Sequence, residues 1–162
     1  MTETAQEARR KTPRFNHIAM SMPSAALDEQ GRREILDFCG EVFGWEELPQ
    51  MTEDRKRLVM MAYVYGQFVF LHGDDKAPMQ APRADHFGMQ VSSMDELDEM
   101  CAKAKAYGEK DARVTVIDKH CDDFGVLKLW SFYVTHLMPL MVEVQFFEHV
   151  PGGTFTGGGP AS

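Results

Sequence analysis

One internal repeat constrains the fold of this chain more than any other feature. The segment RFNHIAMSM, at 14–22, aligns without gaps with RADHFGMQV, at 83–91. The alignment matches His17 with His86, and an arginine and a methionine also recur at equal positions. A repeat of this kind predicts two copies of one supersecondary unit that pack against each other.

An amphipathic helix is indicated after each repeated segment. Apolar residues recur at helical spacing over 35–43 and over 97–104, and an S-x-x-E capping box begins at Ser93. Glycines at 44 and 108 mark the expected ends of the two helices. Three strand-like runs then follow each helix, at 45–52, 57–65 and 67–72 and at 112–118, 124–134 and 139–147. Each half therefore reads β-α-β-β-β, which predicts an α+β fold of two βαβββ modules.

The length of 162 residues suits one domain. Polar or glycine-rich ends predict flexible tails on both sides of a single domain over 14–149. The expected divisions are an N-terminal tail, module one, a Pro-containing linker, module two and a C-terminal tail, at 1–13, 14–72, 73–83, 84–149 and 150–162.

Charge and cysteine content narrow the setting in which the protein works. The net charge of -8 argues against a nucleic-acid groove and against an anionic membrane surface as partners. Three cysteines without a CxxC pair argue against a disulfide framework, and no stretch is long and apolar enough to span a membrane. We therefore expect a cytoplasmic protein whose partner is a small molecule.

The repeated strands have two unlike faces. Alternation places His17 with Ala19 and Ser21 on one face, and His86 with Gly88 and Gln90 on the equivalent face of the second copy. The opposite faces are apolar. A face with one histidine, a small residue and a polar residue suits the lining of a cavity, and a pseudo-twofold arrangement would bring the two histidines together.

Glu143 is a carboxylate inside the apolar run PLMVEVQFFEH. A buried carboxylate is costly without a cation. Two histidines and one carboxylate can form the facial triad of a divalent metal site, for which Fe, Mn, Zn, Co and Ni are all candidates. A simpler interpretation makes both histidines ordinary strand residues and pairs Glu143 with Arg14 or Arg83, and the sequence leaves both interpretations open.

The chain resembles the vicinal oxygen chelate superfamily, which includes glyoxalases, bleomycin resistance proteins and extradiol dioxygenases. The resemblance covers 14–149 and rests on the duplicated unit and on the motifs FNHIAM, FGW, ADHFGMQV and VEVQFF. It implies a glyoxalase-like fold, in which the modules form a curved mixed sheet around a central cavity. It also implies that His17, His86 and Glu143 bind the metal, and that Phe70 stands where some members have a fourth ligand.

In motif spacing the chain is most similar to the type I extradiol dioxygenases. Tyr133, Pro139 and Glu143 match the spacing of their signature, whereas His136 and Leu137 depart from it. The resemblance implies catalytic roles for Tyr133, as a hydrogen-bond donor, and for a base histidine upstream of the second metal histidine. His72 occupies that position, and the resemblance favours Fe(II) or Mn(II) as the metal. The simpler interpretations are a loop histidine for His72 and strand packing for Tyr133.

Three functions remain in competition. The first is a ring-cleaving dioxygenase acting on a small, aromatic vicinal diol. The second is a metal-dependent isomerase, epimerase or lyase that acts through an enediolate, and the third is a non-catalytic protein that binds a small molecule such as a drug. The modules can pair within one chain or swap between two chains, so a homodimer is also open. His120 is interpreted as part of a solvated turn between strands, and neither it nor His136 or His149 receives a role.

Overall fold

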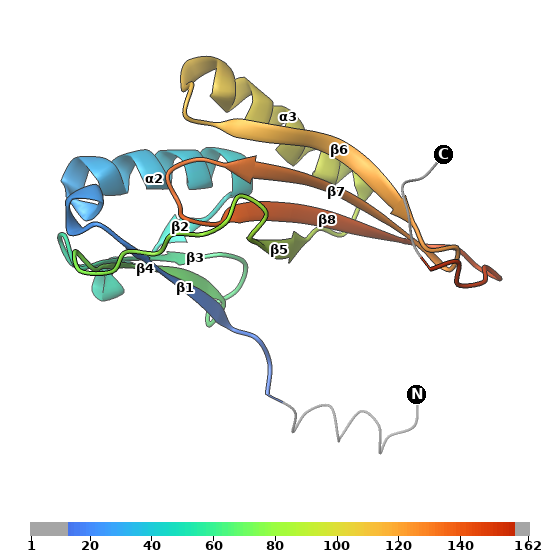
Figure 1. Ribbon diagram of the computed structural model, residues 1–162, viewed down its shortest axis with the longest axis horizontal. Helices are drawn as coiled ribbons and strands as arrows, with labels where there is room; N and C mark the ends of the chain where they lie inside the picture. The colour runs from blue at the N-terminus through green and yellow to red at the C-terminus, as the bar shows by residue number, and fades with distance from the viewer. Residues whose placement is uncertain (1–12, 158–162) are drawn as a thin grey trace.

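The computed structural model describes residues 13–157 (Figure 1). The first module consists of β1 (His17–Met22), the 3-10 turn η1 (Ser24–Leu27), α2 (Glu29–Phe43), β2 (Glu46–Glu47), the 3-10 turn η2 (Pro49–Met51), β3 (Arg57–Met61) and β4 (Phe68–Gly73). The second consists of β5 (His86–Gln90), α3 (Met94–Lys110), β6 (Thr115–Asp123), β7 (Leu127–Thr135) and β8 (Met141–His149). The α+β class and the two βαβββ modules are confirmed.

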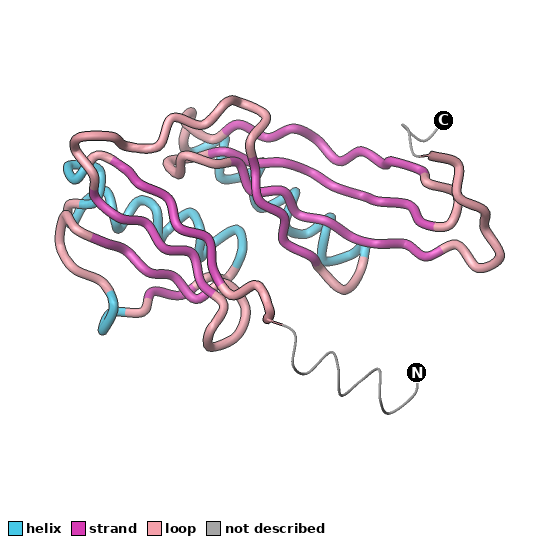
Figure 2. Tube along the Cα trace, turned by 60° about the horizontal axis from the view of Figure 1, so that its bottom comes forward, coloured by secondary structure: helices cyan, strands magenta, loops and turns pink. Residues whose placement is uncertain are grey.

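The strands form two four-stranded mixed sheets within the chain, in the orders β1-β4-β3-β2 and β5-β8-β7-β6. In each sheet the first strand runs parallel to the last, and the other neighbours are antiparallel. Figure 2 shows both sheets in front of their helices. β1 and β5, which carry the repeated histidines, are therefore edge strands, and each has one side without a partner in its own sheet.

Both helices begin and end on local signals, with one difference from the sequence expectation. Asp28 accepts a hydrogen bond from the amide of Gly31, and Ser93 accepts one from the amide of Glu96. Gly44 ends α2 in the left-handed conformation, at a φ of 72°. α3, however, continues through Gly108 to Lys110, because a glycine ends a helix only where the chain adopts a positive φ.

The strands differ from their predicted ranges in two informative places. The run 45–52 forms a strand only at Glu46–Glu47, because Pro49 has no amide hydrogen and begins a 3-10 turn instead. β6 extends to Asp123, so His120 lies on a strand and the interpretation of its surroundings as a solvated turn is wrong. A β-bulge between Ile117 and His120 shifts the alternation of that strand.

One continuous core joins the two modules. Phe38 of α2 is 1% exposed, and its ring contacts Tyr107 of α3 and His136 of the second module, at centroid distances of 5.2 and 4.5 Å. Trp45 of the first module stacks on Phe87 of β5 at 6.3 Å. These contacts fix the position of one module relative to the other.

The expected tails lie mainly outside the described residues. The N-terminal tail, 1–13, is described only at Pro13, and residues 158–162 of the C-terminal tail lie beyond the described part. The preceding segment follows the β6–β7 connection, where the amide of Thr156 donates to the carbonyl of Phe124 at 3.0 Å. No helix within residues 13–157 combines the length and the hydropathy that crossing a membrane requires.

Candidate functional site

His86 and Glu143 form the centre of the candidate site. They lie on neighbouring parallel strands, β5 and β8, where Gly88 is paired with Glu143. Nε2 of His86 is 3.2 Å from Oε2 of Glu143, and Glu143 is 4% exposed. Two of the three expected metal ligands are thus adjacent, with the carboxylate buried beneath the imidazole.

The hydrogen bonds of His86 specify what this pair requires. Nδ1 lies 2.8 Å from the carbonyl oxygen of Ala84, and because a carbonyl can only accept, Nδ1 carries a proton and donates it. Nε2 and the Glu143 oxygen then direct lone pairs at each other, unless a second proton sits on Nε2. A cation shared between the two groups satisfies both, so the donor set fits a divalent metal as well as a proton.

Tyr133 lies beside this pair on β7, where it is paired with Glu143. Its ring packs edge-on against His86 at a centroid distance of 5.2 Å. Burial, together with the hydrogen bond to Glu143 and the charge of that carboxylate, raises the pKa of Tyr133 to about 12. The phenol therefore stays protonated near neutral pH and can act as a hydrogen-bond donor.

His17 occupies the equivalent place in the first module, but it lies apart from the other two ligands. It is exposed, its ring stacks on Phe68 at 4.8 Å, and its Nδ1 donates to Oδ1 of Asn16 at 2.9 Å. Nε2 is left free, as in a histidine prepared for a ligand. Within residues 13–157, however, no group of three or more His, Cys, Asp or Glu side chains is placed to hold a metal ion.

The strand register explains the position of Phe70. β1 pairs with β4 so that Ala19 lies opposite Phe70, as Gly88 lies opposite Glu143 in the second module. Phe70 is therefore the positional equivalent of Glu143. His72 lies two residues farther along β4, opposite Ser21, and its ring stacks on Phe70 at 5.8 Å. It belongs to the same face as His17 and contacts Phe70 rather than His86, Glu143 or Tyr133, so its role as a base stays a prediction.

His120 is a residue that sequence reasoning left without a role. Its ring stacks on Tyr133 at a centroid distance of 5.7 Å, and its Nε2 lies 3.4 Å from Oγ of Ser131, which is fully buried. The structure thus places His86, Glu143, Tyr133 and His120 on one face of the second sheet. Because of the β-bulge before His120, a simple alternation of faces along β6 does not predict that His120 faces Tyr133.

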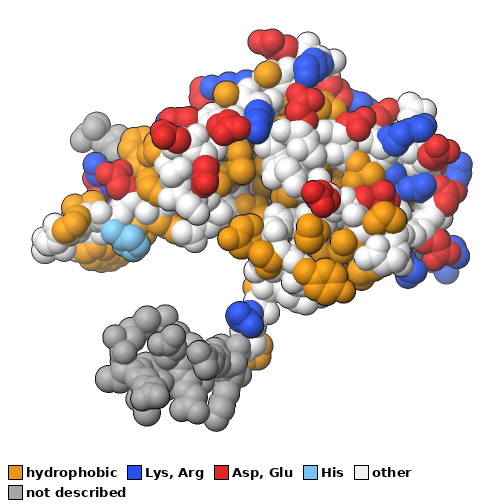
Figure 3. Space-filling view, turned by 180° about the vertical axis from the view of Figure 1, so that it is seen from behind, with side chains coloured by type: hydrophobic (Ala, Val, Ile, Leu, Met, Phe, Trp, Pro, Cys, Tyr) orange, Lys and Arg blue, Asp and Glu red, His pale blue; other side chains and the backbone are white. Residues whose placement is uncertain are grey.

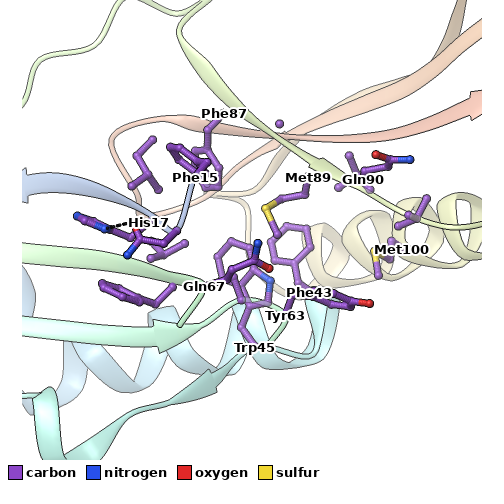
Figure 4. Close-up of a pocket in the computed structure, with 18 of the residues that line it drawn as sticks. Phe15, His17, Phe43, Trp45, Tyr63, Gln67, Phe87, Met89, Gln90 and Met100 are labelled. Atoms are coloured by element: carbon purple, nitrogen blue, oxygen red, sulfur yellow. Dashed lines mark hydrogen bonds between the residues drawn. The ribbon is translucent and has the colours of Figure 1, made fainter. Parts of the chain in front are cut away.

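A groove of about 670 Å³ separates the edges of the two modules. Aromatic side chains dominate its lining, among them Phe15, Phe43, Trp45 and Tyr63. His17 lies at its border, with its ring directed away from the aromatic centre (Figure 4). Across the groove from β1 lies the segment Gly88–Ser92, and His86, Glu143 and Tyr133 are not part of the lining.

The remaining buried histidine has a structural environment. The side chain of His136 is 1% exposed, and its Nε2 lies 2.9 Å from Oδ2 of Asp111. Arg113 also contacts Asp111 and reaches Glu34 of α2 at 2.7 Å. Hydrogen bonds from Arg113, and then from His136, hold the pKa of Asp111 well below its usual range. This network lies at the junction of the modules, away from the candidate site.

Comparison with known proteins defines the fold. No family model matches the chain, and no curated protein sequence matches it either. Among solved structures it is similar to a glyoxalase/bleomycin resistance protein/dioxygenase from Alicyclobacillus acidocaldarius, with 16% identity, a TM-score of 0.56, and coverage of 85% of this chain and 94% of that one. It is also similar to a lactoylglutathione lyase from Agrobacterium tumefaciens, with 17% identity, a TM-score of 0.56, and coverage of 83% and 94%.

A third similar structure contains a metal. It is a variant of the fosfomycin resistance protein FosX from Listeria monocytogenes, complexed with Mn(II) and 1S,2S-dihydroxypropylphosphonic acid, with 15% identity, a TM-score of 0.53, and coverage of 84% of this chain and 92% of that one. At these identities the likeness concerns the fold. The resemblance of the sequence to the vicinal oxygen chelate superfamily is thus confirmed at the level of a glyoxalase-like fold.

Proposed function

We propose that this protein is a metal-dependent enzyme whose centre combines His86 and Glu143 of one chain with His17 of a second copy. The observation that carries the proposal is the pair of His86 and Glu143. Nδ1 of the histidine is committed to Ala84, and its Nε2 meets a buried carboxylate at 3.2 Å. A divalent ion held there would supply a positive charge that polarises oxygens of a bound substrate.

The packing between the modules favours a second copy as the source of His17. Bringing His17 to Glu143 within one chain would require the modules to move, and the contacts of Phe38 and Trp45 across the shared core oppose such a movement. The free edges of β1 and β5 can instead pair with those of another chain. A symmetric dimer of this kind contains two equal centres.

Exposed apolar residues on the first module fit this assembly. Phe15, Tyr63 and Tyr65 are 77%, 79% and 85% exposed. Figure 3 shows hydrophobic side chains gathered at several places on the surface seen from behind. Apolar groups at the surface are typical of sites that are covered by a partner.

Tyr133 and Gly88 would position Glu143 and the substrate in such a centre. The phenol of Tyr133 donates to Glu143, which holds that carboxylate in place. The burial of Glu143 excludes water from one side of the pair, and the glycine at position 88 leaves room next to it for a methyl-sized group. A substrate that approaches over Gly88 would meet the neutral phenol of Tyr133, whose oxygen can still accept a hydrogen bond while its proton is donated to Glu143.

Two reactions fit this arrangement, and a different observation supports each. Ring cleavage of a small vicinal diol is supported by the spacing of Tyr133, Pro139 and Glu143, and it accords with Fe(II) or Mn(II). Isomerase, epimerase or lyase chemistry is supported by the likeness of the fold to a lactoylglutathione lyase. Oxygen uptake with a panel of catechols would favour the first, and deuterium incorporation from solvent without oxygen uptake would favour the second.

Metal content tests the centre itself. Purified protein loaded with Fe(II), Mn(II) or Zn(II) should retain about one ion per chain, and the His86→Ala and Glu143→Gln variants should retain almost none. His149→Ala is the matched control, because His149 is an exposed histidine at the end of β8. Full retention of metal in both site variants would refute the centre.

A binding protein without metal is the remaining candidate, and the aromatic groove between the modules is the observation that favours it. A volume of about 670 Å³ accommodates a small organic molecule, and the net charge of -8 would suit a cationic one. A folded protein that binds no divalent ion but binds a cationic aromatic dye would support this function.

A further inference from the structure

A band of polar side chains crosses the second sheet next to the proposed metal centre. It contains one residue from each strand, and we call it the polar band: Gln90, Gln145, Ser131 and His120. Gln90 is paired with Gln145, Gln145 with Ser131, and Ser131 with His120. Residues that are directly opposite on neighbouring strands share a face, so the band is continuous from β5 to β6.

The polar band is parallel to the row that contains Glu143. Gly88, Glu143 and Tyr133 form that row, and each lies two residues from its neighbour in the band. Two residues of a strand span about 7 Å. A single ring bound at the metal centre can therefore place a substituent against the band.

Gly88 leaves room for a methyl group between row and band. A methyl group built on Gly88 would lie 3.4 Å from Oε1 of Gln145 and 3.6 Å from Oε2 of Glu143. The side chains of Gln145 and Glu143 thus border the area above this glycine, and no side chain of β5 fills it. A ligand can extend from the centre to the band across Gly88.

The charges around the band select against anions. Gln90, Gln145 and His120 offer amide and imidazole groups, whereas Ser131 is fully buried and contacts His120. The carboxylate of Asp122 lies on the same face, 3.9 Å from Nε2 of His120. The lysines of β6 and β7 belong to the opposite face, where Lys119 pairs with Asp98 of α3 and Lys128 lies opposite Glu148. A phosphonate or carboxylate placed here would meet the charge of Asp122 and no lysine or arginine from this sheet.

We propose that the polar band binds the distal end of the substrate, and that this end is an uncharged hydrogen-bonding group such as a carboxamide or hydroxyl. The proposal rests on the proposed metal centre, which would hold the other end. Gln145 offers both a donor and an acceptor, and stacking on Tyr133 fixes the ring of His120. The polar band thus determines which substrates bind, whereas the row of Glu143 lies at the reacting end of the substrate.

Three matched catechols test this assignment by binding rather than by turnover. We would titrate the Mn(II)-loaded protein, without oxygen, with 3,4-dihydroxybenzamide, 4-methylcatechol and 3,4-dihydroxybenzoate and measure each Kd by calorimetry. We expect the benzamide to bind about five- to tenfold more tightly than 4-methylcatechol, since one or two hydrogen bonds are gained. The benzoate should bind most weakly of the three.

Variants assign the effect to the band. Gln145→Leu should remove the advantage of the benzamide and leave the Kd of 4-methylcatechol nearly unchanged, and His120→Phe, which keeps an aromatic ring beside Tyr133, should reduce that advantage in part. Gln145→Lys should move the benzoate from the weakest to the tightest ligand. Gln50→Leu, an exposed glutamine on η2, is the control and should change nothing.

The outcomes separate this inference from the proposed function. Equal binding of the three catechols, or tightest binding of the benzoate by the unaltered protein, overturns the role of the polar band while the metal centre stands. Retained preference for the benzamide in Gln145→Leu and His120→Phe also overturns it. Bound Mn(II) with no binding of any catechol refutes chelation of a diol, and the inference then fails with it.

Discussion

Mixing two defective chains gives a direct test of whether each centre spans two copies. In the proposed dimer, one centre takes His17 from the first chain and His86 with Glu143 from the second, and the other centre takes the reverse set. A heterodimer of the His17→Ala and Glu143→Ala chains therefore has one centre with both defects and one with none. We expect about one metal ion per heterodimer, against about two in the unaltered dimer and almost none in either variant alone.

The measurement needs the two chains to be distinguishable. Co-expression with two different affinity tags and sequential purification isolates the heterodimer, and elemental analysis then gives its metal content. The reciprocal control is a heterodimer of the unaltered chain with the double variant, which has one defect in each centre and should bind almost no metal. If the centres lie within single chains, the two results are exchanged, and the proposed sharing of ligands is refuted.

Three further predictions follow from the contacts described above. In the metal-free protein, the pKa of Tyr133, about 12, should fall part of the way toward 10 in Glu143→Gln, because the carboxylate charge is lost while burial, the largest cause, remains. An unchanged phenol titration by ultraviolet absorbance would contradict the part that we assign to Glu143. Because the folded state depresses the pKa of Asp111, its contribution to stability is present above about pH 4 and is lost as the pH falls through the folded pKa. Urea unfolding of Asp111→Asn should therefore show a smaller loss of stability between pH 6 and pH 3 than the unaltered protein, and an equal loss would count against the network with Arg113. Phe38→Ala should lower the free energy of unfolding by about 3–5 kcal/mol, since a buried ring shared by both modules is removed; a loss below about 1 kcal/mol in chemical denaturation would contradict the shared core.

The repeated segments contain enough information to predict the modules, because strand alternation and helical periodicity are local properties. The apolar run around Glu143 indicated that this carboxylate would be buried, and the facial-triad interpretation placed it near His86. In the structure the parallel pairing of β5 with β8 brings the two side chains within 3.2 Å. The placement of His17 could not be predicted in this way. The two modules can form the centre within one chain or between two chains, and both arrangements bury the same residues of each module. Only the contacts of Phe38 and Trp45 favour the arrangement between two chains.

Two other features depend on interactions that no short window of sequence displays. The bulge in β6 changes which residues face Tyr133, so His120 could be placed only once the pairing of β6 with β7 was known. The end of α3 depends on the backbone conformation at Gly108, which a glycine leaves free. The register with β7 decides the first case, and the backbone conformation at Gly108 decides the second.

The hydrogen bonds at Nδ1 of the two repeated histidines determine which ring nitrogen can bind a ligand and how much rotational entropy the ring loses on binding. Nδ1 of each imidazole donates to a residue that precedes its strand, to the side-chain oxygen of Asn16 for His17 and to the main-chain carbonyl of Ala84 for His86. Both rings therefore carry a proton on Nδ1 before any ligand arrives. Nε2 is therefore the nitrogen that can bind a metal in both rings, and in His86 it already lies 3.2 Å from Oε2 of Glu143. Each hydrogen bond at Nδ1 reduces the rotational freedom that the ring would lose on binding. The ordering of both rings thus takes place during folding, and each module achieves it with a different acceptor.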